Sequence, residues 1–304
     1  MNILVTSAGG PAAIGVIKSI RHFDIENKHK IIATDISELS VGLHLADEGY
    51  TVPKANKDYF TQTIAKIVKE AEIDVILPTG NLEIDQFQEL SHMTNVFMSD
   101  SKTIKLCNDK WSFYEKVKND FPIPETWQDD DLKWMGCFAR PRFELGGSRG
   151  TLHCKDIHQY MSTFNSKTEY VYSKYLPGQE YTIDVLCDMN SNPLIAIPRK
   201  RLETKAGISS KGEIISDKNI EKKCKETCRF LKLKGPVCIQ MKEDENGIPN
   251  FVEVNPRFGG GTFFTTLAGV NFVEIIISLL ENKKIFIKEP QNIKVIRYME
   301  EIVL

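Results

Sequence analysis

The stretch FVEVNPRFGGG, residues 251–261, carries the strongest functional signal in this 304-residue chain. Phe251, Glu253 and Asn255 alternate with two valines, which predicts a β-strand with Glu253 and Asn255 on one face and two apolar residues behind. The upstream segment VCIQMK predicts a second strand, with Gln240 available to the same face. Both strands would therefore present oxygen-bearing side chains to one side of a sheet.

These side chains predict a metal site. The Asn246-Gly247 pair between the two strands is typical of a hairpin turn, which would bring Gln240 next to Glu253 and Asn255. One carboxylate and two amide oxygens beside Arg257 suit Mg²⁺ bound to a polyphosphate. An ordinary amphipathic hairpin that ends in an Asn-Pro turn explains the same pattern, so this stretch alone leaves both interpretations open.

Composition narrows the class of protein. Charged residues make up 26 % of the chain, hydrophobic residues 41 %, and the net charge is −2, which is typical of a globular protein without a basic footprint for nucleic acid. No apolar run reaches membrane-spanning length, and the start MNILVTSAGG lacks the features of a signal peptide. The seven cysteines are odd in number and scattered without zinc spacing. We therefore expect a cytoplasmic protein with free thiols and no nucleic-acid or membrane partner.

The first hundred residues predict a small α/β domain. Strand signals alternate with helix signals, which implies a parallel sheet with right-handed crossovers. We expect strands at 2–6, 30–34, 74–77 and 96–98, and helices at 12–22, 59–70 and 82–90. Residues 1–100 thus predict a Rossmann-like domain, and residues 101–304 a separate α+β part.

The remainder of the chain has a different pattern. A helix is expected at 101–117, strands dominate 135–188, and a glycine-rich loop at 146–150 interrupts them. Residues 199–213 are polar and contain glycine, which predicts a mobile loop. Helices are then expected at 218–231 and 272–281.

Two segments could hold phosphate or ribose. The loop at 146–150 follows Arg140, and glycines allow backbone N–H groups to approach phosphate oxygens closely. A flexible hairpin is the alternative. Glu180 begins a predicted strand and could accept hydrogen bonds from ribose hydroxyls, although an isolated surface carboxylate is more common.

Two further segments could hold a substrate. Arg199 and Arg201 either bind a substrate phosphate or carboxylate, or form the solvated end of a strand. Gly9 and Gly10 lie in TSAGGPAAIG, which lacks the dinucleotide spacing but could bind an anion at the start of a helix. A simple tight turn explains this loop equally well.

Taken in order, these segments resemble the ATP-grasp superfamily, most closely its carbamoyl-phosphate-synthase-like branch. The resemblance covers almost the whole chain and implies that the nucleotide lies between two α+β lobes. A full carbamoyl-phosphate synthase large subunit has two such halves, whereas this chain has room for one. Carbamoyl phosphate synthesis is therefore not the expected activity.

The resemblance implies a role for each matching residue. Lys110, Arg140 and Arg257 correspond to residues that contact phosphates, with Arg140 and Arg257 acting in catalysis. The phosphate-covering loop corresponds to Gly146, Gly147 and Ser148, and the ribose-binding carboxylate to Glu180. The metal ligands correspond to Gln240, Glu253 and Asn255, with Gln240 and Glu253 also part of the ATP site. Ser173, Tyr175 and Leu176 occupy the adenine-contacting segment, where the family commonly has a Glu that is missing here.

The implied chemistry is activation of a small-molecule carboxylate by ATP and Mg²⁺, with Mn²⁺ able to substitute. An amine would attack the acylphosphate, and Arg199, Arg201, Gly9 and Gly10 would contact the substrates. An ATP-grasp kinase and a non-catalytic nucleotide-binding protein remain alternatives. Many members of the superfamily are dimers, so the resemblance also implies a homodimer as one candidate assembly.

Overall fold

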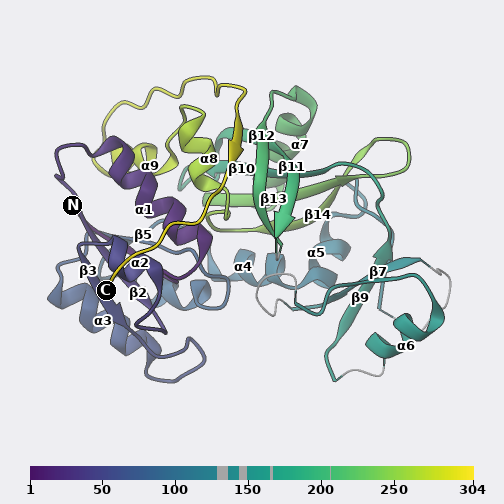
Figure 1. Ribbon diagram of the computed structural model, residues 1–304, viewed down its shortest axis with the longest axis horizontal. Coiled ribbons are helices and arrows are strands. Elements are labelled where there is room, and N and C mark those ends of the chain that lie inside the picture. Colours follow the sequence, from purple (N-terminus) through teal and green to yellow (C-terminus); the bar gives the residue numbers. More distant parts are fainter. Residues whose placement is uncertain (129–135, 144–148, 165–166, 206) are drawn as a thin grey trace.

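A computed structural model describes residues 1–128, 136–143, 149–164, 167–205 and 207–304. Three sheets dominate these residues, and the six-stranded sheet lies between the other two (Figure 1). The N-terminal sheet lies on one side with α1, α3 and α9, and the small sheet with α6 lies on the other (Figure 1).

The N-terminal sheet is parallel, as the sequence predicted. Its strand order is β3-β2-β1-β4-β5, and Ile3, Leu4 and Val5 at its centre are completely buried. The strands are β1 (Asn2–Val5), β2 (Lys30–Asp35), β3 (Glu48–Thr51), β4 (Val75–Leu77) and β5 (Asn95–Val96). The helices are α1 (Pro11–Phe23), α2 (Val41–Leu45), α3 (Phe60–Glu70) and the 3₁₀ helix η1 (Ile84–Leu90).

The sequence analysis did not predict two elements of the N-terminal region, β3 and α2. β3 is an edge strand whose side chains alternate between half-buried and exposed, and it contains a glycine. α2 is only five residues long. Both are too short to give a periodic hydrophobic signal, since α2 has five residues and β3 has four.

The predicted helix at 101–117 is two helices, α4 (Ser101–Asn108) and α5 (Lys110–Val117). Asp109 separates them with an extended backbone, and its side chain caps α5. The small sheet follows, with strand order β6-β9-β7-β8. It consists of β6 (Thr126–Trp127), β7 (Cys137–Pro141), β8 (Leu152–Cys154) and β9 (Tyr170–Lys174), accompanied by α6 (Ile157–Phe164).

The central sheet is antiparallel, with strand order β14-β13-β10-β11-β12-β15. Its strands are β10 (Glu180–Cys187), β11 (Pro193–Lys205), β12 (Ile208–Ile214), β13 (Gly235–Glu243), β14 (Pro249–Asn255) and β15 (Lys294–Ile296). The helices of this part are α7 (Lys218–Phe230), α8 (Thr262–Leu267) and α9 (Phe272–Leu280).

The prediction of a mobile loop at residues 199–213 was wrong. Most of it forms the end of β11 and nearly all of β12, which pair from Arg199↔Ile214 to Lys205↔Ile208. Arg199 and Ile214 are buried on this hairpin, and Ser209 is 7 % exposed. Tertiary burial on one face thus produces strands from residues whose polarity suggests a loop.

Helix α1 joins the N-terminal sheet to the C-terminal helices. Its buried face, which includes Val16 and Ile20, belongs to the same hydrophobic cluster as Phe264 of α8 and Ile276 of α9. Hydrogen bonds cross this contact as well, from Asn271 Nδ2 to the Ser19 carbonyl oxygen (2.7 Å) and between the Ser19 and Thr266 hydroxyls (2.7 Å). The N-terminal and C-terminal parts therefore share one core.

Within the described residues, no helix is long and apolar enough to cross a membrane. The seven cysteines are all buried thiols.

Candidate active site

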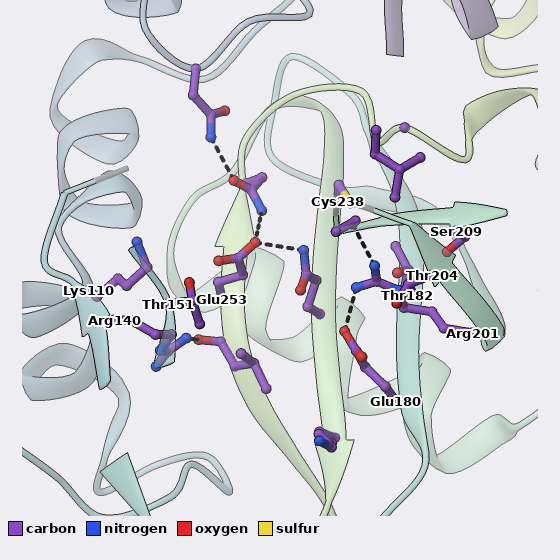
Figure 2. Close-up of a pocket in the computed structure, with 18 of the residues that line it drawn as sticks. Lys110, Arg140, Thr151, Glu180, Thr182, Arg201, Thr204, Ser209, Cys238 and Glu253 are labelled. Atoms are coloured by element: carbon purple, nitrogen blue, oxygen red, sulfur yellow. Dashed lines mark hydrogen bonds and ion pairs between the residues drawn. The ribbon is translucent and has the colours of Figure 1, made fainter. Parts of the chain in front are cut away.

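A cavity of about 650 Å³ lies where the three sheets meet. Its walls carry cations and few carboxylates, which suits an anionic ligand. Figure 2 shows Lys110 and Arg140 on one side of Glu253, and Glu180 with Arg201 on the other. The predicted site residues that line it are Gly10, Lys110, Arg140, Ser173, Tyr175, Leu176, Glu180, Arg199, Arg201, Gln240, Glu253, Asn255 and Arg257.

The three predicted metal ligands converge on neighbouring strands. Gln240 of β13 lies opposite Glu253 of β14. Glu253 Oε1 accepts hydrogen bonds from Gln240 Nε2 (2.7 Å) and Asn255 Nδ2 (2.9 Å). A carboxylate and two amide groups in direct contact can supply the oxygen ligands that Mg²⁺ prefers. The residues present therefore fit the predicted metal.

A register shift shapes this hairpin. Gln240 pairs with Glu253, but Met241 pairs with Phe251, so Val252 is the extra residue of a bulge. Phe251 consequently packs in the core. The Val252 carbonyl oxygen accepts a hydrogen bond from Arg140 Nη1 (2.9 Å), which ties the small sheet to the central one.

Arg140 and Lys110, the two predicted phosphate contacts on one side of Glu253, have different surroundings (Figure 2). Arg140 is 8 % exposed, and its Nε has no hydrogen-bond partner among the described residues. Burial lowers the pKa of Arg140, an effect that the charge of Glu253 partly opposes. A buried guanidinium with an unused donor is well suited to an incoming phosphate oxygen.

Lys110 is positioned by the start of α5. Asp109 caps this helix by accepting from the N–H groups of Trp111 (3.1 Å) and Ser112 (3.3 Å). Arg142 holds the same carboxylate through Nε (2.8 Å) and Nη2 (2.6 Å). Burial would raise the pKa of Asp109, but the contacts with Arg142 and Ser112 lower it to about 2.

At the other end of the cavity, aromatic side chains gather beside the segment predicted to contact adenine. The rings of Tyr175 and His153 are stacked, with centroids 3.9 Å apart and planes at 2°. Lys242 Nζ lies 5.0 Å from the Tyr175 ring centroid. Leu176 is 7 % exposed and adds an apolar wall. Such a surface can contact a planar base.

Glu180 and Arg201 form an ion pair with each other. The sequence assigned Glu180 to ribose and Arg201 to a substrate, and the structure brings the two together. Arg201 also donates to the Gly207 carbonyl oxygen (2.6 Å), and its side chain is 6 % exposed. Two of its nitrogens are thus bonded within the protein, whereas its buried Nε has no hydrogen-bond partner among the described residues.

Arg199 is almost completely buried, at 1 % exposed. Its Nη1 donates to Asp184 Oδ2 (3.0 Å) and to the Gly261 carbonyl oxygen (3.0 Å). A Cβ on Gly261 would lie 2.1 Å from Arg199 Cζ, so glycine is required for this close approach. Arg199 lines the cavity, but its charge is paired inside the protein.

The remaining predicted residues lie in two loops. Gly10 precedes α1 and lines the cavity, whereas the Gly9 N–H group donates to Asp35 Oδ2 (2.7 Å). Gly9 is not among the lining residues. Gly146, Gly147 and Ser148 lie outside the described residues.

Three residues at or beside the cavity had no individual signal in the sequence. Asn81 contacts both Asn255 and Arg257, Glu83 is a buried acid below the same loop, and Asp184 pairs with Arg199. Asn81 lies just beyond the predicted strand at 74–77, after Pro-Thr-Gly, and ligands bind beyond the carboxyl ends of strands in parallel sheets. That position was the available clue.

Two segments of the chain match known protein families. Residues 3–98 match the family described as PylC-like, N-terminal domain. Residues 166–302 match the family described as ATP-grasp in the biosynthetic pathway with Ter operon. A search of curated protein sequences found no match.

Solved structures share the fold at low sequence identity. N5-carboxyaminoimidazole synthetase from Staphylococcus aureus, complexed with ADP, has a TM-score of 0.74 and 17 % identity over 93 % of this chain and 78 % of its own. The biotin carboxylase domain of Hydrogenobacter thermophilus 2-oxoglutarate carboxylase, solved with MgADP, ADP and bicarbonate, has a TM-score of 0.72 and 16 % identity over 95 % and 71 %. Biotin carboxylase from Campylobacter jejuni has a TM-score of 0.69 and 16 % identity over 93 % and 71 %.

Proposed function

We propose that this chain is an ATP- and Mg²⁺-dependent carboxylate–amine ligase. The proposal starts from the match of residues 166–302 to an ATP-grasp family and of residues 3–98 to the PylC-like N-terminal domain. It would activate a small-molecule carboxylate as an acylphosphate, which an amine attacks to release phosphate. ADP is the second product.

The observation that carries this proposal is the hydrogen-bonded group of Gln240, Glu253 and Asn255 in one cavity with three cations. Lys110, Arg140 and Arg257 line the same cavity. An oxygen-rich metal set facing cations is what phosphoryl transfer requires. A protein that only binds a nucleobase has no physical need for this combination.

The residues of the chain would work mainly by position and charge. A carboxylate oxygen attacks the γ-phosphorus of ATP, and the bond to the β–γ bridging oxygen breaks as ADP leaves. Arg140 and Lys110 would stabilise the charge that develops on the transferring group from one side, and Arg257 from the other. Mg²⁺ bound by Gln240, Glu253 and Asn255 would neutralise the β- and γ-phosphates.

In the second half-reaction the amine nitrogen would form a bond to the acyl carbon, and phosphate would leave with the electron pair of the C–O bond. The amine gives up its protons to phosphate and solvent. Exclusion of water matters here, because an acylphosphate hydrolyses. The Gly146, Gly147 and Ser148 loop is our candidate for covering the site.

Substrate contacts are assigned to Gly9, Gly10, Arg199 and Arg201. Gly10, Arg199 and Arg201 line the cavity, which supports this assignment for them. We further propose that Mn²⁺ can replace Mg²⁺, that the protein forms a homodimer, and that it works in the cytoplasm. The seven buried thiols support a reducing compartment.

The test is ADP release from Mg·ATP against a panel of carboxylic acids, each with and without pooled amino acids. Release that needs both an acid and an amine is the expected result. Release with one acceptor alone would replace the ligase with a kinase. Absence of ADP binding by calorimetry would overturn the assignment.

A further inference from the structure

Asn81 is a side chain of the N-terminal domain that touches the predicted metal site directly. It lies in the loop after β4, and 174 residues separate it from Asn255. Its Nδ2 donates to Asn255 Oδ1 (2.8 Å), and its Oδ1 accepts from Arg257 Nε. Both ends of one amide are therefore used, one on a predicted metal ligand and one on a predicted phosphate ligand.

These hydrogen bonds fix which way the side-chain amides of Asn81 and Asn255 point. Arg257 can only donate, so Asn81 must present its oxygen to Arg257 and its nitrogen to Asn255. Asn255 must then turn its oxygen toward Asn81 and its nitrogen toward Glu253, which can only accept when ionised. A guanidinium at one end and a carboxylate at the other thus set the direction of the amides between them.

This orientation matters for metal binding because only the oxygen of an amide can ligate Mg²⁺. A carbonyl oxygen has two lone pairs, so Asn255 Oδ1 can accept from Asn81 and still bind a cation. Without Asn81, Glu253 would be the one remaining partner among the described residues that orients the Asn255 amide. Arg257 would also lose the partner that holds its Nε.

The loop that carries Asn81 is itself held firmly. A Cβ on Gly80 would lie 2.2 Å from Ser7 Oγ, so the loop packs directly on the turn after β1. Glu83 Oε1, two residues beyond Asn81, accepts from Ser7 Oγ (2.8 Å) and from Thr6 Oγ1. Asn81 is therefore presented from a rigid support.

We propose that Asn81 is a positioning residue that fixes Asn255 as an oxygen ligand for Mg²⁺ and holds Arg257 toward the phosphates. The inference rests on the proposed function, because it requires Asn255 to ligate the metal. It also makes Mg²⁺ binding dependent on the docked N-terminal domain. Outer partners of metal ligands typically change metal affinity by about 10–100-fold.

The test is calorimetric titration of the full chain with ADP over a series of Mg²⁺ concentrations and in EDTA. Asn81→Ala is expected to raise the Mg²⁺ concentration that gives half of the affinity gain by about 10-fold or more. ADP affinity in EDTA should change much less, because no metal ligand needs orienting there. An unchanged Mg²⁺ midpoint would overturn the proposal.

A double-mutant cycle tests whether the effect passes through Asn255. In an Asn255→Ala background, adding Asn81→Ala should shift the midpoint by less than about twofold, since the group that it orients is gone. A full, additive shift would contradict the role assigned to Asn81. Asn81→Ala should keep the fold because Asn81 is only half-buried, and circular dichroism checks the fold of every variant, including those at the buried Asn255.

Asn95→Ala is the matched control. Asn95 belongs to the same domain, and its exposed side chain donates to the Asp74 carbonyl oxygen (3.0 Å), away from the cavity. This variant should keep the wild-type Mg²⁺ midpoint. If wild-type ADP binding does not depend on Mg²⁺, the metal assignment fails. If it does and Asn81→Ala behaves like wild type, only the role of Asn81 fails.

Discussion

At the scale of single residues, Glu83 shows how the protein holds an acid without a cation. It is 7 % exposed, and its contacts are the hydroxyls of Thr6 and Ser7 and the N–H group of Gly80. Burial raises the pKa of Glu83 from 4.5 to about 7, although these three donors oppose the shift and the charge of Asp35 adds to it. The carboxyl therefore changes charge near neutral pH.

Replacing Glu83 should change how the free energy of unfolding depends on pH. The folded chain keeps the proton at pH values where the unfolded chain has released it, so this stability is present below pH 4.5 and lost as the pH rises through about 7. A glutamine at this position cannot ionise. Between pH 5 and pH 8, the free energy of unfolding of Glu83→Gln should therefore rise by roughly 2–3 kcal/mol relative to that of the wild type. Urea unfolding of both proteins at the two pH values measures this. Parallel pH dependence would contradict it.

Glu253 is the residue on which the metal assignment depends most. Glu253→Ala should abolish the Mg²⁺-dependent gain in ADP affinity and ATP turnover, because the one carboxylate of the set is removed. The fold should persist because the side chain is half-buried, although Gln240 and Asn255 each lose a hydrogen-bond acceptor. Calorimetry and circular dichroism measure both, with Glu115→Ala as a surface control. Full turnover in folded Glu253→Ala would refute the assignment.

Arg140 provides a complementary variant on the opposite wall. Arg140→Ala should weaken binding of Mg·ATP because the unused Nε donor and the positive charge are both lost. The Val252 carbonyl oxygen would also lose its partner across the two sheets. Unchanged affinity for Mg·ATP by calorimetry would contradict the placement of Arg140 beside the phosphates.

At the scale of secondary structure, the start of α5 links stability to the site. Asp109 caps the helix, pairs with Arg142 of the neighbouring strand region, and directly precedes Lys110. The direction in which Lys110 leaves the backbone is thus fixed by the cap. A substitution of Asp109 should therefore change the position of Lys110 in the cavity, although Asp109 is not among the residues that line it.

Asp109→Ala should therefore lower both stability and nucleotide affinity. The expected loss is about 2 kcal/mol, from a helix cap and a partly buried double hydrogen bond with Arg142. ADP affinity should fall several-fold. Asp217→Ala is the control, since Asp217 caps α7 through the N–H groups of Asn219 (3.0 Å) and Ile220 (3.0 Å). It should cost about 1 kcal/mol without changing ADP affinity. Equal ADP affinities in both variants would refute the link.

At the scale of the whole molecule, the shared core joins the first hundred residues to the rest. The buried face of α1 packs on α8 and α9, and strands of the two large sheets contribute to the same cluster. The predicted division near residue 100 separates two sheets, but it also cuts through this cluster. Binding and folding of the two parts are thus coupled.

A fragment of residues 1–100 should consequently be unable to fold stably by itself. Removing α8 and α9 exposes Val16, Ile17 and Ile20 of α1, which are at most 1 % exposed in the full chain. We expect the fragment to bind a hydrophobic dye and to unfold without a cooperative transition. A sharp urea transition with no dye binding would contradict the shared core.

Much of the fold and the site follows from local patterns in the sequence. Hydrophobic alternation and periodicity predicted the parallel sheet, the β13–β14 hairpin and most helices, because burial of one face imposes those periods. The alternation of Glu253 and Asn255, with Gln240 upstream, also predicted that these three side chains meet. The resemblance to the ATP-grasp superfamily rested on the order of such segments.

The tertiary structure alone decided what depends on distant contacts. The bulge at Val252 turns Phe251 into the core, the polar segment around Arg201 becomes strand, and Glu180 pairs with Arg201. Asn81 meets Asn255 across 174 residues. Such pairings depend on packing energies summed over the whole molecule, and local hydrophobic periodicity cannot predict them.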